Sequence, residues 1–94
     1  MIDFKNVYTK LKNDVGNLQE NHYILLKSFK KDRWIKVELL YSNFVVTEQG
    51  FKKQIYNFNF SDLKKLQKFL KELVDFEFPR SNKIWYSVGE NKDA

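Results

Sequence analysis

The sequence predicts a small α+β domain in which an antiparallel meander of about four strands is covered by a C-terminal helix. Three observations support this fold class. Residues 22–60 are rich in β-branched and aromatic side chains and are broken only by short polar turns. Residues 61–75 carry apolar side chains at helical spacing, and residues 3–19 show a second helical pattern. With 94 residues, we expect one domain spanning residues 1–94.

We expect the N-terminal helix over residues 3–19. Its apolar residues recur at three- and four-residue steps and form one stripe: Phe4, Val7, Tyr8, Leu11, Val15 and Leu18. Asp3 is the predicted N-cap, because a carboxylate accepts backbone N–H groups of the first turn. Gly16 and Asn17 favour an end to the helix.

The meander is predicted from four β-rich segments separated by polar turns: Tyr23–Phe29, Trp34–Tyr41, Phe44–Glu48 and Lys52–Phe60. The connections are too short for crossovers, so neighbouring strands must be antiparallel. A four-residue turn at 30–33 would place Phe29 opposite Trp34 and Lys27 opposite Lys36.

Alternation along these strands predicts two faces. The first is the expected core face, with Ile24, Leu26, Ile35, Val37, Leu39, Tyr41, Phe44 and Val46, and with Tyr56, Phe58 and Phe60 from the last strand. The second face carries Lys27, Phe29, Trp34 and Lys36, followed by Leu40, Val45, Lys53 and Ile55. The helix at 61–75 would cover the first face.

The helix at 61–75 has Ser61 as its predicted N-cap and an apolar face of leucines, Phe69 and Val74. Pro79 ends regular structure. A short last strand is expected at 84–88, and residues 90–94 are expected to fray.

The composition excludes several classes of site. The chain has no cysteine, which removes disulfides, thiolate nucleophiles and cysteine-based zinc sites. The lack of cysteine favours a reducing, cytoplasmic setting. The charged opening residues predict no signal peptide, and the apolar stretches are too short to span a membrane. We expect no cofactor.

The net charge of +5 makes a polyanion a candidate partner. On the second face, aromatic rings would stack bases while lysines meet phosphates, as in single-strand binders. The predicted nucleic-acid-binding residues are Lys27, Phe29, Trp34, Lys36 and Lys53, joined by a lysine stripe on the last helix, Lys64, Lys68 and Lys71. Three plainer interpretations stay open: the N-terminal helix or a second copy in a homodimer covers the face, the helix lysines are simply solvated, and AT-rich coding explains the lysine content.

Catalytic patterns are missing from the sequence. His22 is the only histidine, and no carboxylates lie at a spacing that would gather around it as a metal site. Asp75 and Glu77 alternate with Phe76 and Phe78, a pattern typical of an exposed edge rather than of an acid/base pair. We therefore expect no enzyme, although a small basic toxin-like ribonuclease stays open as a minor alternative.

The order of four strands followed by a helix over residues 22–75 resembles the repeat unit of the PUR proteins, the Whirly proteins and the transcriptional-coactivator single-strand binders. The resemblance is one of topology, and no motif of those families is present, so no functional residue is carried over. The first hypothesis is a non-enzymatic binder of single-stranded nucleic acid. The alternative is a protein–protein interaction module, such as a phage or mobile-element inhibitor of a host complex.

Overall fold

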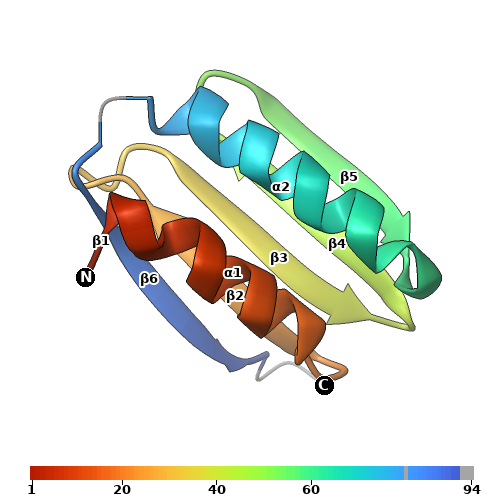
Figure 1. Ribbon diagram of the computed structural model, residues 1–94. Helices are drawn as coiled ribbons and strands as arrows, with labels where there is room; N and C mark the ends of the chain where they lie inside the picture. The colour runs from red at the N-terminus through yellow and green to blue at the C-terminus, as the bar shows by residue number, and fades with distance from the viewer. Residues whose placement is uncertain (80, 92–94) are drawn as a thin grey trace.

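The computed structural model describes residues 1–79 and 81–91. A six-stranded sheet in the order β1-β6-β2-β3-β4-β5 carries two helices on one face (Figure 1). All neighbouring strands are antiparallel. The elements are β1 Ile2–Asp3, the 3-10 turn η1 Phe4–Asn6, α1 Val7–Gly16, β2 His22–Lys27, β3 Trp34–Leu40, β4 Asn43–Gln49, β5 Lys53–Asn59, η2 Phe60–Asp62, α2 Leu63–Glu77 and β6 Lys83–Glu90. The predicted α+β class is confirmed, with more strands than expected.

The N-terminal helix is shorter than predicted. It ends at Gly16, as the sequence indicates, but it begins only at Val7. Asp3 is not its N-cap: this residue is extended, makes no capping hydrogen bond and belongs to β1. Ile2 and Asp3 pair with Ile84 and Lys83 of β6. That pairing depends on a strand from the far end of the chain, which local periodicity does not reveal.

The turn between β2 and β3 is longer than predicted and shifts the register. Lys27 lies opposite Trp34, and Leu25 lies opposite Lys36, so the predicted four-residue turn at 30–33 is wrong. Residues 28–33 form the connection instead. Because the shift is two residues, each strand residue keeps its predicted face. Phe29, however, leaves the sheet and lies in the turn.

Tyr41 was expected in the core but is 90% exposed in the turn between β3 and β4. Tyr41 and Ser42 both have positive φ angles, 53° and 62°, a geometry that two-residue hairpins require and that non-glycine residues rarely adopt. The Glu20 carboxylate accepts hydrogen bonds from the backbone N–H groups of Tyr41 and Ser42 at 2.6 and 3.1 Å. This distant side chain stabilises the turn.

The start of α2 also differs from the prediction. Asn59, rather than Ser61, supplies the capping oxygen, which accepts the Ser61 N–H at 2.9 Å and begins η2. The helix then runs two residues beyond the predicted end, to Glu77. Asp75 and Glu77 are therefore helical and not on a strand edge, and Glu77 is fully buried.

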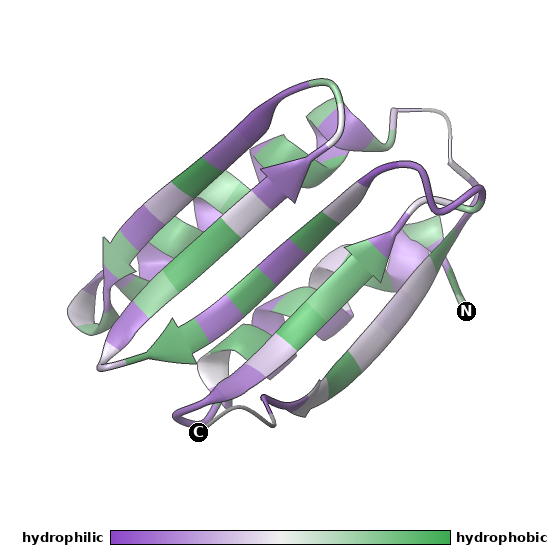
Figure 2. Cartoon of the chain, turned by 180° about the vertical axis from the view of Figure 1, so that it is seen from behind, coloured by the Kyte–Doolittle hydropathy of each residue, from purple (hydrophilic) through white to green (hydrophobic). Residues whose placement is uncertain are grey.

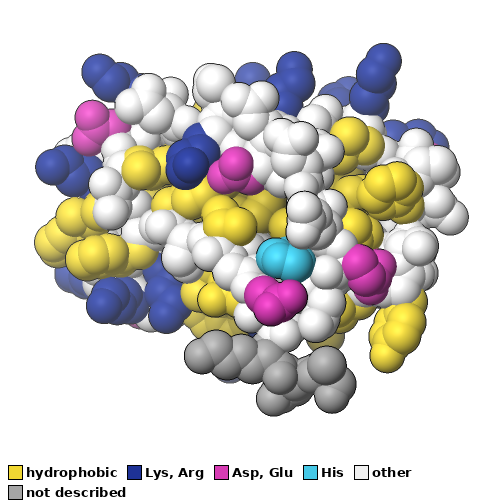
Figure 3. Space-filling model, turned by 90° about the horizontal axis from the view of Figure 1, so that it is seen from below, with side chains coloured by type: hydrophobic (Ala, Val, Ile, Leu, Met, Phe, Trp, Pro, Cys, Tyr) yellow, Lys and Arg dark blue, Asp and Glu magenta, His cyan; other side chains and the backbone are white. Residues whose placement is uncertain are grey.

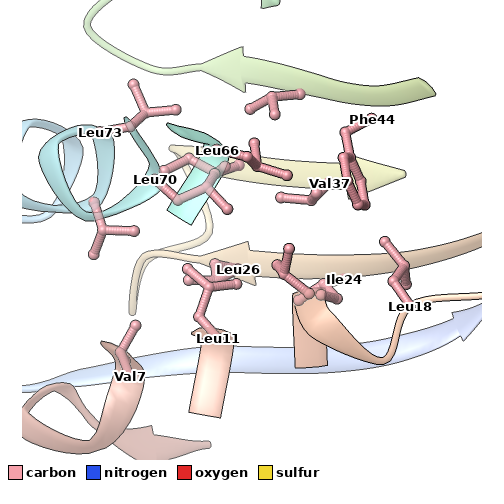
Figure 4. Packing of buried hydrophobic residues seen from close by; sticks show 14 of the residues in the cluster. Val7, Leu11, Leu18, Ile24, Leu26, Val37, Phe44, Leu66, Leu70 and Leu73 are labelled. Carbon is pink, nitrogen blue, oxygen red and sulfur yellow. The ribbon is translucent and has the colours of Figure 1, made fainter. Parts of the chain in front are cut away.

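The core lies between the sheet and both helices (Figure 4). Helix α2 buries Leu66, Leu70, Leu73 and Val74, while α1 buries Val7, Leu11 and Val15. The predicted apolar sheet face supplies the other side, with Ile24, Leu26, Ile35, Val37, Phe44 and Val46 all buried. The two helices are also joined by a hydrogen bond from the Tyr8 hydroxyl to Asp75.

The last strand is present, longer than the predicted 84–88, and lies between β1 and β2. Its end contradicts the expected fraying of residues 90 and 91. Glu90 pairs with His22, and the Asn91 N–H donates to the Asn21 carbonyl at 2.8 Å. The rest of the predicted tail, residues 92–94, lies outside the described residues.

Candidate nucleic-acid interface

Among residues 1–79 and 81–91, both helices lie on one face of the sheet and none lies on the other (Figure 2). The interpretation that the N-terminal helix covers this face is wrong, because α1 packs beside α2 on the opposite side (Figure 1). A six-stranded sheet is wide enough for both helices, and the apolar stripe of α1 completes the core there. We call the uncovered side the open face.

The centre of the open face is a row of alternating aromatic and basic side chains. Lys27 pairs with Trp34 of β3 on one side and with Trp85 of β6 on the other. Directly opposed residues of an antiparallel pair have their side chains side by side. With strands about 4.8 Å apart, the backbone positions of the two tryptophans lie about 10 Å apart with Lys27 between them. Both tryptophans are partly exposed. Gln49 and Lys53 continue the row.

The next row of the open face contains Lys36, which lies beside both an aromatic ring and a carboxylate. Its ammonium lies 5.0 Å from the centroid of the Tyr23 ring and 3.7 Å from a carboxylate oxygen of Glu38. The ring and the carboxylate both attract the cation and hold it on the sheet. Leu25, Thr47 and Ile55 complete this row.

The structure brings together four of the predicted binding residues, Lys27, Trp34, Lys36 and Lys53, on the open face. Phe29 lies beyond the end of β2 in the turn, where its side chain is 62% exposed. Lys64, Lys68 and Lys71 are exposed on α2, on the other side of the sheet. The sheet lysines and the helix lysines therefore do not form one continuous surface.

Trp85 and Tyr23 were missed as candidate residues. The alternation in Ile84, Trp85 and Tyr86 indicates that Trp85 faces away from a core residue. The sequence did not show which strand β6 would pair with, and only that pairing places Trp85 beside Lys27. The indole N–H of Trp85 donates to the Phe29 carbonyl at 3.0 Å, which ties the 28–33 turn to the open face.

Charge is distributed unevenly along the open face. One end, which we call the basic end, is formed by the turns at 28–33 and 50–52 and the start of β6. It carries Lys30, Lys31, Arg33, Lys52, Lys53 and Lys83. The opposite end has acidic side chains beside the only histidine (Figure 3). His22 Nε2 lies 4.0 Å from Glu90, and its Nδ1 is 2.9 Å from the Glu20 carbonyl. A polyanion would be attracted to the basic end.

Two buried carboxyl groups lie behind the basic end, on the helix side of the sheet. Glu77 is fully buried and its carboxylate accepts the N–H groups of Phe51 and Lys52 at 2.9 and 3.4 Å, which fixes the 50–52 turn. Glu48 is 1% exposed. Burial, and then its hydrogen bond with Glu77, raises the pKa of Glu48.

One oxygen of the Glu48 carboxyl is hydrogen-bonded and the other is not, a pattern that a proton on the second oxygen would explain. Glu48 Oε1 accepts the Tyr56 hydroxyl at 2.7 Å, and this bond raises the pKa of Tyr56 to about 12. Glu48 Oε2 is buried and has no hydrogen-bond partner among residues 1–79 and 81–91. A proton on this oxygen would be donated to Glu77 and would satisfy both acids.

Neither a metal site nor a membrane-spanning helix is found in the described part of the chain. Within residues 1–79 and 81–91, no three His, Cys, Asp or Glu side chains gather in a way that could hold a metal ion. None of the helices found there is long and apolar enough to cross a membrane. The chain matches no protein-family model, and no curated protein or solved structure is significantly similar to it.

Proposed function

We propose that this protein binds single-stranded nucleic acid, without catalysis, through the open face. The observation that carries the proposal is the uncovered row in which Lys27 lies between Trp34 and Trp85. Each indole offers a surface for stacking one base, and the lysine between them can pair with the phosphate that joins the two nucleotides. A sheet that presents aromatic rings in this way is a recurring solution for single-stranded RNA.

The charge and exposure of the row support the same conclusion. Stacking requires rings that are accessible, and both tryptophans are partly exposed; the Trp85 indole is also held by its hydrogen bond to the Phe29 carbonyl. Lys27, Lys36 and Lys53 supply positive charge on the same face, and the basic end adds more. Because the chain is free of cysteine, the proposal places the protein in the reducing cytoplasm, where single-stranded RNA and DNA are available.

The proposal is tested by titrating a labelled single-stranded oligonucleotide at two salt concentrations. Trp34→Ala and Trp85→Ala should each weaken binding about 5- to 150-fold, which corresponds to the loss of ~1–3 kcal/mol of stacking per base. Phe60→Ala is the matched control, since Phe60 is an exposed aromatic residue (55%) in η2, outside the open face. Unchanged affinity of both tryptophan variants would refute the proposal.

A second candidate, a protein–protein interaction module, is favoured by the apolar residues on the same face. Leu25 and Val45 are partly exposed there, and Ile55 is 65% exposed at the edge strand β5. A protein partner or a second copy would bury these residues, and its binding would depend weakly on salt. If the protein does not bind the oligonucleotide even at low salt, this alternative is favoured.

A further inference from the structure

The basic end of the sheet contains a groove of about 880 Å³. Three parts of the chain that are far apart in sequence meet there: the 28–33 turn, Phe51 of the 50–52 turn, and the residues Pro79, Ser81, Asn82 and Lys83 near the start of β6. Its walls include Phe29, Phe51 and Pro79, and its charged groups include Lys30, Arg33 and Lys83. A volume of this size is typical of sites for small organic ligands.

Hydrogen bonds hold the 28–33 turn, which forms one wall of the groove. The Ser28 N–H donates to the Arg33 carbonyl at 2.9 Å, the Arg33 N–H donates to the Ser28 hydroxyl at 3.2 Å, and that hydroxyl donates to Asp32 at 2.7 Å. Arg33 Nε donates to the Glu77 carbonyl at 2.8 Å, which anchors the turn to the end of α2. Preorganisation of this kind lowers the entropy cost of binding.

The aromatic side chains of the groove are exposed. Phe29 is 62% and Phe51 is 60% exposed, so both rings are accessible to a ligand. The Arg33 guanidinium lies 4.8 Å from the Phe51 ring centroid, and Phe76 packs edge-on against the same ring at 5.8 Å. These contacts fix the Phe51 ring at the groove wall without burying it.

The charges of the groove suit an anion. Among the described residues that line it, Asp32 is the acidic one, and the Ser28 hydroxyl lowers the pKa of this carboxyl. Arg33 lies 3.8 Å from it and offsets its charge. Lys30 and Lys83 are exposed and are available to a phosphate. Lys31 lies 4.7 Å from the Trp85 ring centroid, at the border between the groove and the open face.

From these observations we infer that the groove is a nucleotide-binding site that continues the open face, with a base stacked on Phe29 or Phe51 and a phosphate bound by Lys30 and Lys83. This inference rests on the proposed function and extends it. The single-stranded nucleic acid that stacks on Trp34 and Trp85 continues past the end of β2, and its next nucleotide enters the groove. Lys83 and Trp85 lie on the same side of β6, so the two sites are adjacent.

The test uses adenosine 5′-monophosphate as a probe small enough to occupy the groove alone. In an amide chemical-shift titration, it should perturb residues 28–33 and 81–83 more than residues at the far end of the sheet. Phe29→Ala and Lys83→Ala should each weaken its binding about 5-fold or more, the lower limit for loss of one stacked base or one phosphate contact. Phe60→Ala and Lys65→Ala, exposed residues outside the groove, should leave binding unchanged.

The outcomes separate this inference from the proposed function. If the oligonucleotide binds in a Trp34-dependent way but the probe shifts no groove resonance, the groove inference is overturned and the proposed function stands. If the probe binds in the groove while oligonucleotide binding does not depend on Trp34 and Trp85, the groove still binds a nucleotide, but the open-face proposal fails and the continuity of the groove with it is overturned. If an acidic peptide perturbs residues 28–33 at lower concentration than the nucleotide does, the groove is a site for protein and the inference is overturned.

Discussion

Replacing Glu48 with glutamine should remove a pH dependence from the stability of this protein. Glu48 and Glu77 are both buried, and two ionised carboxylates cannot share such a site without strong repulsion. A glutamine amide would reproduce the protonated acid: its oxygen would accept the Tyr56 hydroxyl and its NH2 would donate to Glu77. The variant would therefore keep the Tyr56 hydrogen bond and lose the ability to ionise.

The sign and size of the effect follow from the raised pKa of Glu48. A group with a raised folded-state pKa stabilises fully below its unfolded value of about 4.5, and that stabilisation is lost as the pH rises through the folded-state value. Across that window, the free energy of unfolding of the wild type should fall relative to Glu48→Gln by up to ~1.4 kcal/mol per pH unit. Above the window, the difference should be constant.

The assay is urea unfolding followed by tryptophan fluorescence at a series of pH values, with the free energy taken by linear extrapolation. Glu72→Gln, at an exposed position of α2, controls for the loss of one negative charge. Parallel stability curves for the wild type and Glu48→Gln over the whole range would refute the argument. So would a Glu48→Gln variant that loses stability with rising pH as steeply as the wild type does.

Three further results are expected. Leu70→Ala, at a site 1% exposed under α2, should cost about 2–5 kcal/mol and lower the melting temperature by at least about 8 °C; an unchanged melting temperature would contradict the packing of α2. Gly50→Ala should lower the free energy of unfolding by about 1–3 kcal/mol in the same denaturation assay, because a Cβ there would lie 2.1 Å from the buried Glu77 Oε1. At Gly16, a Cβ would meet no atom within 4 Å outside its own helix backbone and chain neighbours, so Gly16→Ala should be neutral or stabilising. Lys36→Ala should weaken oligonucleotide binding regardless of base sequence and reduce the salt slope by about one charge; a change confined to one base sequence would contradict phosphate contact.

The local pattern of the sequence was sufficient for the two helices, the strands of the meander and the division of side chains between two faces. Alternation along a strand survives an error of two residues in the turn, so Lys27, Trp34, Lys36 and Lys53 were assigned to the correct face despite the wrong register. Helix ends were less well predicted, because the distant strand β6 and the side chain of Asn59 decided where α1 and α2 begin.

The sequence by itself determined which side chains share a face, because strand and helix periodicity is a property of consecutive residues. Only the tertiary structure decided that both helices lie on one face and leave the other open (Figure 2). It also decided that β6 pairs with β2, which places Trp85 beside Lys27, and that three separate turns meet at the groove. These outcomes depend on which apolar surfaces pack together across the whole chain, and contacts between segments many residues apart leave no periodic signal in either segment alone.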